Sequence, residues 1–128
     1  MSRAHTIALL LALGSLSAGC ATYHAYDGPR RPADEIAIVT GAAKLRAATP
    51  LALVIRAVDE RSVDVRYSSV ALTPGPHRLL VDCQLGEQPG TASRHSIDID
   101  VGAGERYRLT AQMRPGNRAC ASVELEAE

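Results

Sequence analysis

The stretch Ile97-Asp98-Ile99-Asp100-Val101-Gly102-Ala103-Gly104-Glu105-Arg106-Tyr107-Arg108-Leu109 sets the fold class of this chain. On each side of its glycine turn, apolar residues alternate with charged ones. Successive side chains of a β-strand point to opposite faces, so each half of the stretch is predicted to be a strand with one buried and one solvated face. A turn this short between two such strands favours an antiparallel hairpin, the basic unit of an all-β domain.

A three-residue loop over 102–104 also predicts the register of this hairpin. Each aspartate of the first strand then lies opposite an arginine of the second, while the apolar residues oppose one another on the other face. The expected cross-strand ion pairs are Asp98–Arg108 and Asp100–Arg106. Opposite charges in such positions stabilise a sheet, so we interpret the two aspartates as part of a neutralised strand face and not as a catalytic acid and base.

Shorter strand-like runs separated by turn residues fill the rest of the chain. Residues 51–58 are apolar on both faces except at Arg56, as expected for a central strand. The stretches Thr73-Pro74-Gly75-Pro76 and Arg114-Pro115-Gly116-Asn117 are typical of turns. Short strands with a turn about every ten residues predict a small antiparallel β-sandwich, which we place at residues 35–128 as a single domain.

The first residues carry a different pattern, that of a processing signal. Arg3 precedes an uncharged apolar run over residues 6–16, which is too short for a membrane-spanning helix of about 20 residues. Small residues follow and lead into a cysteine. The stretch Leu16-Ser17-Ala18-Gly19-Cys20 resembles the lipobox of bacterial lipoprotein signals.

This resemblance implies an anchor and a location. In such lipoproteins the signal, here 1–19, is cleaved before the cysteine, whose thiol receives a diacylglyceryl group and whose new amine is acylated. Cys20 is therefore the expected lipidation site, and its acyl chains are the expected contact with the membrane. Ala21, in place of an aspartate, resembles the default signal for export to the outer membrane, where the domain would face the periplasm.

Residues 20–34 are expected to form the lipidated cysteine and a short tether. Gly28, Pro29 and Pro32 lie in this segment, which has no apolar periodicity.

Three cysteines are present, and lipidation would use one of them. Cys83 and Cys120 then form an even pair in an oxidising compartment, which predicts a disulfide. The pattern raises one objection, because Cys83 falls on the apolar face of its strand whereas Cys120 is out of phase with the apolar residues that follow it. A bulge near Asn117 is therefore required.

Composition and motifs give no indication of catalysis. The formal net charge is zero and the chain has no Trp or Phe, which offers no basis for binding nucleic acid by charge or by stacking. His24, His77 and His95 have no second donor at metal-ligand spacing. No nucleophile motif or phosphate-binding loop occurs, so the sequence predicts no catalytic residue, no cofactor and no metal site, and a protein that is not an enzyme.

Past residue 30 the chain is similar to a group of small bacterial envelope lipoproteins. The matching pieces are Gly28-Pro29-Arg30, Glu35-Ile36-Ala37-Ile38, Ile55-Arg56-Ala57-Val58-Asp59, Leu72-Thr73-Pro74-Gly75-Pro76-His77 and residues 101–109. The fourth piece also resembles the turn of PEGA-type surface domains, which implies an Ig-like or PEGA-like sandwich. The group brings no activity to carry over. Glu60 departs from the glycine that often follows the aspartate, which places a tight turn there in question.

These observations indicate an envelope lipoprotein with a structural or protein-interaction role. We expect a protein partner to add a strand to the sheet edge at residues 35–39, where Ile36 and Ile38 supply backbone donors. Residues 119–125 are the other candidate edge, guarded by the nearby glutamates. The alternative is a module that binds a small molecule, a metal or a peptidoglycan fragment, and an envelope hydrolase is the reading with the least support.

Overall fold

The computed structural model of the chain describes residues 21–46, 49–86, 93–116 and 119–128. Within these ranges the chain forms strands and one short 3-10 helix, η1, at Ala33–Glu35. The strands are β1 (Thr22–His24), β2 (Ala37–Thr40), β3 (Ala42–Arg46), β4 (Thr49–Val58), β5 (Arg61–Ser62), β6 (Ser69–Leu72), β7 (Gly75–Leu85), β8 (Ser93–Val101), β9 (Arg106–Met113) and β10 (Cys120–Ala127). None of the described segments is a helix long and apolar enough to cross a membrane.

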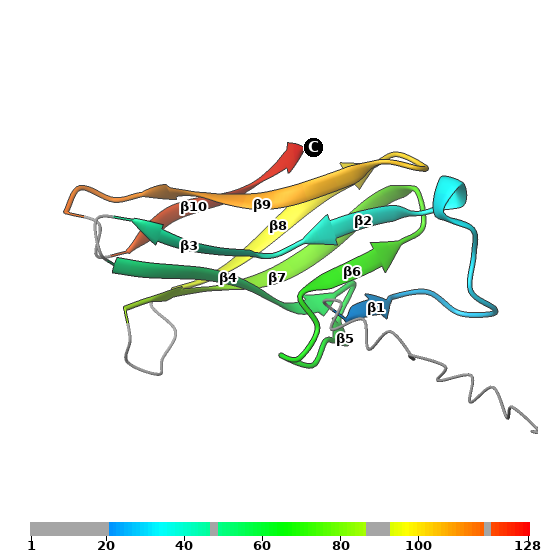
Figure 1. Ribbon diagram of the computed structural model, residues 1–128, viewed down its shortest axis with the longest axis horizontal. Helices are drawn as coiled ribbons and strands as arrows, with labels where there is room; N and C mark the ends of the chain where they lie inside the picture. The colour runs from blue at the N-terminus through cyan, green and yellow to red at the C-terminus, as the bar shows by residue number, and fades with distance from the viewer. Residues whose placement is uncertain (1–20, 47–48, 87–92, 117–118) are drawn as a thin grey trace, which may run out of the picture.

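Two sheets stack face to face, and the prediction of an all-β sandwich is confirmed (Figure 1). The first sheet has the strand order β1-β6-β2-β9-β10, and the second has the order β3-β4-β7-β8 with β5 paired to β4. The second sheet is antiparallel, as predicted. The first sheet is mixed instead, because β1 runs parallel to β6 and β2 runs parallel to β9.

The core between the sheets consists of aliphatic side chains from the central strands. The most deeply buried are Val39, Leu53, Ile55, Val58, Val70, Leu72, Leu79, Val81, Val101 and Leu109. Burying a side chain of this size stabilises a fold by about 1.5–3 kcal/mol relative to leaving it in water. Among the described residues, Tyr107 is the one aromatic side chain in this buried set, in keeping with a chain that has no Phe or Trp.

The chain changes sheets at Gly41. β2 lies in the first sheet and β3 in the second, although Gly41 alone separates them. A Cβ atom at this position would lie 2.5 Å from the Leu53 carbonyl oxygen, closer than real Cβ atoms approach a backbone atom. The crossing therefore requires a residue without a side chain. In Figure 1 the two strands follow one another as a nearly continuous ribbon.

The predicted hairpin between β8 and β9 is wrong. β8 pairs with β7 in the second sheet, whereas β9 pairs with β2 and β10 in the first. The turn between them is thus an arch that crosses the sandwich. An arch and a hairpin give the same alternation, because in both cases each strand directs its apolar residues toward the core.

The four charged residues of that hairpin have other neighbours than predicted. Asp98 binds Arg78 on β7, with Nε to Oδ1 at 2.8 Å. Arg108 lies 3.7 Å from the Glu128 carboxylate, Nε to Oε1. Asp100 lies opposite Pro76 and Arg106 lies beside Ile38. The predicted pairs Asp98–Arg108 and Asp100–Arg106 are therefore absent from the described residues, since the partners belong to different sheets.

The predicted docking edge at residues 35–39 is also wrong. β2 lies between β6 and β9, so strands pair with both of its backbone edges. Ile36 is 5% exposed, and the Ile38 N–H donates to the Glu105 carbonyl at 3.1 Å. The run Ile36-Ala37-Ile38-Val39 has no polar face, which is the pattern of a central strand and not of an edge.

The segment predicted as a tether belongs in part to the domain. Residues 22–24 form β1, and this strand adds a parallel edge to β6. The Ser68 N–H donates to the Ala21 carbonyl at 3.2 Å, and the Ala25 N–H donates to the Ala71 carbonyl at 3.0 Å. A strand of three residues is too short to show a periodicity, and backbone hydrogen bonds do not depend on side-chain identity, so the sequence pattern does not reveal it.

Candidate functional site

The predicted lipidation site lies at the boundary of the folded domain. Cys20 itself is outside the described residues, but Ala21 is the next residue and is hydrogen-bonded to Ser68. Consecutive Cα atoms are about 3.8 Å apart, so Cys20 adjoins the first strand without a spacer. An anchor at Cys20 would hold the β1 edge of the first sheet directly against the membrane.

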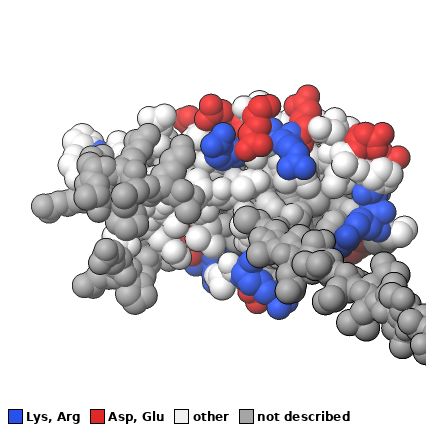
Figure 2. Space-filling model, in the orientation of Figure 1, with Lys and Arg blue, Asp and Glu red and all other residues white. Residues whose placement is uncertain are grey.

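The opposite edge of the same sheet is β10. Four strand spacings of about 4.8 Å separate β1 from β10, a distance of about 19 Å. Glu124, Glu126 and Glu128 are exposed on this side, next to Arg106 and Arg108 of β9. Figure 2 shows acidic and basic side chains along the side of the molecule on which β9 and β10 lie in Figure 1.

The backbone of β10 has an outward-facing row of donors. The Glu128 N–H donates to the Arg106 carbonyl at 2.9 Å, so this residue faces β9. Backbone groups alternate in direction along an antiparallel strand, hence the N–H groups of Ala127 and Leu125 point away from β9. Within the described part of the chain no strand pairs with β10 on that side.

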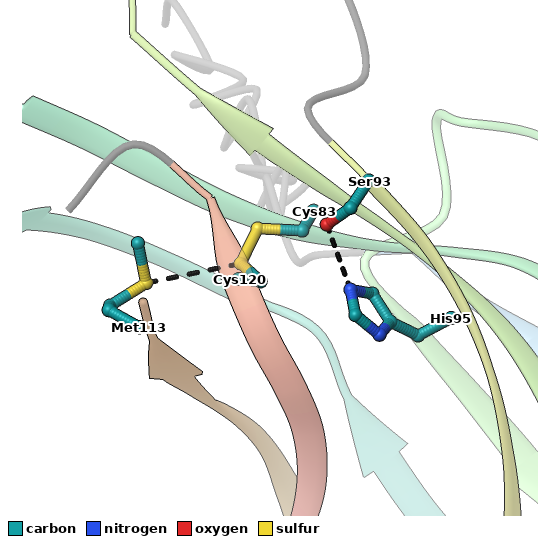
Figure 3. Close-up of a disulfide and its surroundings, with 5 residues drawn as sticks. All are labelled: Cys83, Ser93, His95, Met113 and Cys120. Carbon is teal, nitrogen blue, oxygen red and sulfur yellow. Dashed lines mark hydrogen bonds between the residues drawn. A yellow bond between two sulfur atoms is a disulfide. The ribbon is translucent and has the colours of Figure 1, made fainter. Parts of the chain in front are cut away.

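Cys83 and Cys120 are joined as a disulfide that links the two sheets (Figure 3). Their Cα atoms are 6.5 Å apart, and both side chains are buried. The register of β10 against β9 shifts between Cys120 and Ser122, so Ala121 is the extra, exposed residue of a bulge. The required bulge thus lies at Ala121, while Asn117 is outside the described residues. The bulge turns Cys120 toward the core, so Cys120 is buried although it is out of phase with the apolar residues that follow it.

A serine and a histidine lie beside this disulfide (Figure 3). Ser93 Oγ is 2.8 Å from His95 Nε2, a distance at which a histidine could accept the proton of a nucleophile. A hydrolytic triad also needs a carboxylate that orients the ring through Nδ1. No carboxylate of the described residues forms that hydrogen bond, so the pair lacks the third member.

A polar cluster at His77 joins two pieces singled out in the sequence. His77 Nδ1 is 2.5 Å from Asp59 Oδ2, and His77 Nε2 is 2.6 Å from the Thr73 carbonyl. Both ring nitrogens are thus occupied, one by a carboxylate and one by a backbone carbonyl, so neither is free to face the hydroxyl of a nucleophile. This Asp–His pair therefore connects the β4–β5 turn to β7 and does not form part of a catalytic triad.

The turn after Asp59 is tight despite its lack of glycine. Asp59 and Glu60 both have positive φ, 47° and 67°. Burial raises the pKa of the Asp59 carboxyl, but the hydrogen bonds from the Arg78 N–H and from His77, with the charges of His77 and Arg61, outweigh this and leave it below its usual value. The tight turn questioned in the sequence because Glu60 replaces a glycine is therefore present, and the side-chain contacts of Asp59 hold it in place.

Potential metal ligands do not cluster within the described residues. No group of three or more His, Cys, Asp or Glu among them is arranged to hold a metal ion. His24 lies edge-on to the Tyr26 ring, with 5.7 Å between centroids. Asp82 is buried and bound by Arg94 at 2.7 Å, with Arg56 at 3.5 Å. An open cleft lies between β4 of the second sheet and β9 and β10 of the first, lined by Leu51, Leu53, Leu109, Leu125 and six further residues.

Comparison with protein-family models, with curated proteins and with solved structures found no match to this chain.

Proposed function

We propose that this chain is a lipid-anchored lipoprotein of the bacterial outer membrane, with its sandwich in the periplasm and with a structural or protein-interaction role. The observation that carries the proposal is the stretch Leu16-Ser17-Ala18-Gly19-Cys20, which ends one residue before the Ala21–Ser68 hydrogen bond. A cleavable signal that ends at the first residue of a folded domain is consistent with a cysteine that becomes the mature N-terminus.

The interaction surface that we propose is the β10 edge, in place of residues 35–39. This edge lies across the sheet from the anchor and has backbone donors at Leu125 and Ala127 that face away from β9. An extended segment of a partner can add to such an edge, with backbone bonds giving affinity and alternate side chains giving selectivity. The glutamates of β10 restrict pairing to partners of suitable charge.

The anchor is tested by the change Cys20→Ser in the full-length protein expressed in a diderm bacterium. We expect an unprocessed precursor that no longer enters the detergent phase, whereas the wild-type protein does. Ser15→Ala is the matched control, because it changes the signal segment without removing the cysteine. Normal processing and partitioning of the Cys20→Ser protein would refute the anchor.

The docking edge is tested by comparing Leu125→Pro with Leu125→Ala. Proline removes the outward N–H, and an edge strand tolerates it there because that N–H makes no bond within the sheet. Alanine shortens the same side chain but retains the donor. After crosslinking in intact cells, we expect loss of the partner from Leu125→Pro and its retention by Leu125→Ala. Equal recovery from both variants, each with wild-type melting behaviour, would exclude strand addition at β10.

The alternative of a small-molecule module rests on the cleft between β4 and the β9–β10 pair. Three of its four leucines are buried in the core, and the polar side chains of Thr110, Gln112 and Glu124 make up much of the rest of its lining, so the cleft suits a small polar molecule. A ligand that raises the melting temperature of the wild-type protein, but not of Gln112→Ala at the exposed rim of the cleft, would favour this function over a protein partner.

A further inference from the structure

The residues around the anchor include a turn with an exposed apolar tip. Ser68, which binds the Ala21 carbonyl, ends the loop of residues 63–68. Val65 in this loop is 63% exposed, and it is the one large aliphatic residue of the described chain with such exposure. Three residues of chain span at most about 11 Å, so Val65 lies close to the point where the domain meets Cys20.

This exposed tip is well ordered by its own hydrogen bonds. The Tyr67 N–H donates to the Asp64 carbonyl at 3.1 Å, which closes a β-turn with Val65 and Arg66 at its two central positions. The Arg66 N–H also donates to the Asp64 carboxylate at 2.9 Å. The turn therefore presents Val65 and Arg66 in a fixed geometry, at the cost of an apolar side chain in water.

Aromatic and cationic groups lie in the same loop and against it. The rings of Tyr23 and Tyr67 pack against each other with 5.4 Å between centroids. The Arg66 guanidinium lies over the Tyr67 ring at 5.1 Å. Tyrosine and arginine next to an aliphatic tip are the residue types that favour the boundary between acyl chains and headgroups, because each has an apolar body and a polar end.

Two acidic groups of this corner are neutralised by arginines. The Asp64 carboxylate is 4.0 Å from Arg66 Nε, and the Asp27 carboxylate is 3.1 Å from Arg61 Nη2. Each carboxylate is thus matched by an arginine, and the corner has no net negative charge from these four residues. Anionic headgroups would meet no uncompensated repulsion from them.

We propose that the 63–68 loop is a second contact with the lipid bilayer, in which Val65 enters the headgroup region while Tyr67 and Arg66 lie at the interface. This rests on the proposed lipid anchor at Cys20, whose acyl chains would hold Ala21, and through it Ser68, at the membrane surface. The two contacts together fix the orientation of the sandwich, with the β1 edge against the bilayer and the β10 edge away from it. In Figure 1 the start of β1 and the loop after β5 lie on the lower side of the molecule and β10 on the upper side.

The chain has no tryptophan, so one introduced indole reports on its position without interference. We would place it by Val65→Trp in the lipidated protein, with Glu126→Trp on β10 as the matched control. Both proteins are reconstituted in vesicles of phosphatidylethanolamine and phosphatidylglycerol, with and without brominated acyl chains. We expect a blue shift and strong quenching for Val65→Trp, and neither for Glu126→Trp.

The outcomes separate the loop from the anchor. If both proteins float with the vesicles but Val65→Trp is not quenched more than Glu126→Trp, the loop contact is wrong while the anchor stands. If neither protein floats, the anchor itself is wrong and the inference falls with it. Hydrogen exchange of the wild-type lipoprotein provides a test without substitutions, because amides 64–67 are expected to exchange more slowly on vesicles than in detergent while amides 125–127 do not change. Equal rates for 64–67 in both would likewise overturn the loop contact.

Discussion

At the scale of single residues, His77 and Asp59 explain why two separate sequence pieces occur together. His77 ends the Leu72-Thr73-Pro74-Gly75-Pro76-His77 stretch, and Asp59 ends the stretch from Ile55. Their contact, with the Arg78 N–H bound to Asp59 Oδ1 at 2.8 Å, fastens the β4–β5 turn to β7. The pair therefore has a structural role, although an aspartate next to a histidine is also the combination found in catalytic sites.

The change Asp59→Asn is expected to destabilise the fold at neutral pH by about 1 kcal/mol. Hydrogen bonds to a charged group contribute about 1.5–3 kcal/mol, and we discount that range because half of the Asp59 side chain is exposed. The folded pKa of Asp59 lies below its unfolded value, so its contribution is present above about pH 4 and disappears as the pH falls through the folded pKa.

Urea unfolding of Asp59→Asn and wild type between pH 7 and pH 2 measures this effect. The difference in free energy of unfolding should be largest at neutral pH and should shrink below about pH 4. A difference that grows on acidification would contradict the assigned role of Asp59.

The disulfide is the second contact that single residues control. Its closed loop has a sequence separation of 37 residues, for which the chain-entropy model gives a stabilisation of about 4 kcal/mol. We expect the double change Cys83→Ala with Cys120→Ala to lower the free energy of unfolding by about that amount. Added reductant should lower the stability of the wild type toward that of the variant and leave the variant unchanged. Reductant sensitivity of the double variant would point to another cause.

At the scale of elements, the crossing from β2 to β3 depends on Gly41. The change Gly41→Ala forces a Cβ toward the Leu53 carbonyl, which cannot move without disrupting β4. Overpacking of this kind costs about 1–3 kcal/mol. Gly102→Ala is the control, because its Cβ would meet only the flexible Glu105 side chain at 3.2 Å. The melting temperature of Gly41→Ala should be well below that of Gly102→Ala. Similar melting temperatures would show that the backbone at the crossing can shift to make room for a Cβ atom.

The strands themselves could be predicted from alternation, but their partners could not. The patterns around Ile99 and Tyr107 predict two strands, and both residues are buried as expected. Alternation indicates which face of a strand is buried, but it does not indicate which strand lies beside it. It therefore predicts a hairpin where the chain forms an arch. Asp98 illustrates the consequence, since its arginine is on β7 and no local pattern links the two residues.

Candidate sites that depend on local sequence were easier to predict than those that depend on topology. The cysteine pair followed from arithmetic and compartment, and Cys83 and Cys120 lie together in the structure. A docking edge can be predicted only from the strand order, and β2 is central because β9 pairs with it in parallel across about half the length of the chain. The contact of the 63–68 loop with Ala21 gave no sequence signal, because it is a backbone hydrogen bond.

At the scale of the whole molecule, the sheet order links the proposed anchor to the proposed interaction surface. β1 and β10 are the two ends of the first sheet, so a domain attached to lipid at β1 would present β10 on the side away from the membrane. A flexible tether would remove this constraint, because the domain could then rotate freely above the membrane. The absence of a spacer between Cys20 and β1 is therefore the feature on which orientation depends.

The absence of a spacer predicts that the folded domain begins at residue 21 and not at residue 35. A fragment of residues 21–128 retains β1, whereas a fragment of residues 35–128 matches the boundary predicted from sequence and lacks it. The shorter fragment loses the hydrogen bonds of Ala21, of Ala25 and between Thr22 and Ser69, and it uncovers the edge of β6. At about 0.5–1.5 kcal/mol for each bond, we expect a loss of about 3 kcal/mol.

Urea unfolding of both purified fragments measures the difference. A tether contributes nothing to folding, so equal midpoints would mean that residues 21–34 act as a tether after all and that the lipid anchor leaves the domain free to rotate. A lower midpoint for 35–128, together with a smaller dependence on urea because less surface is buried, would place β1 in the cooperative unit. The orientation of the sandwich on the membrane would then follow from the fold itself, since the strand that joins the anchor could not detach without unfolding part of the sheet.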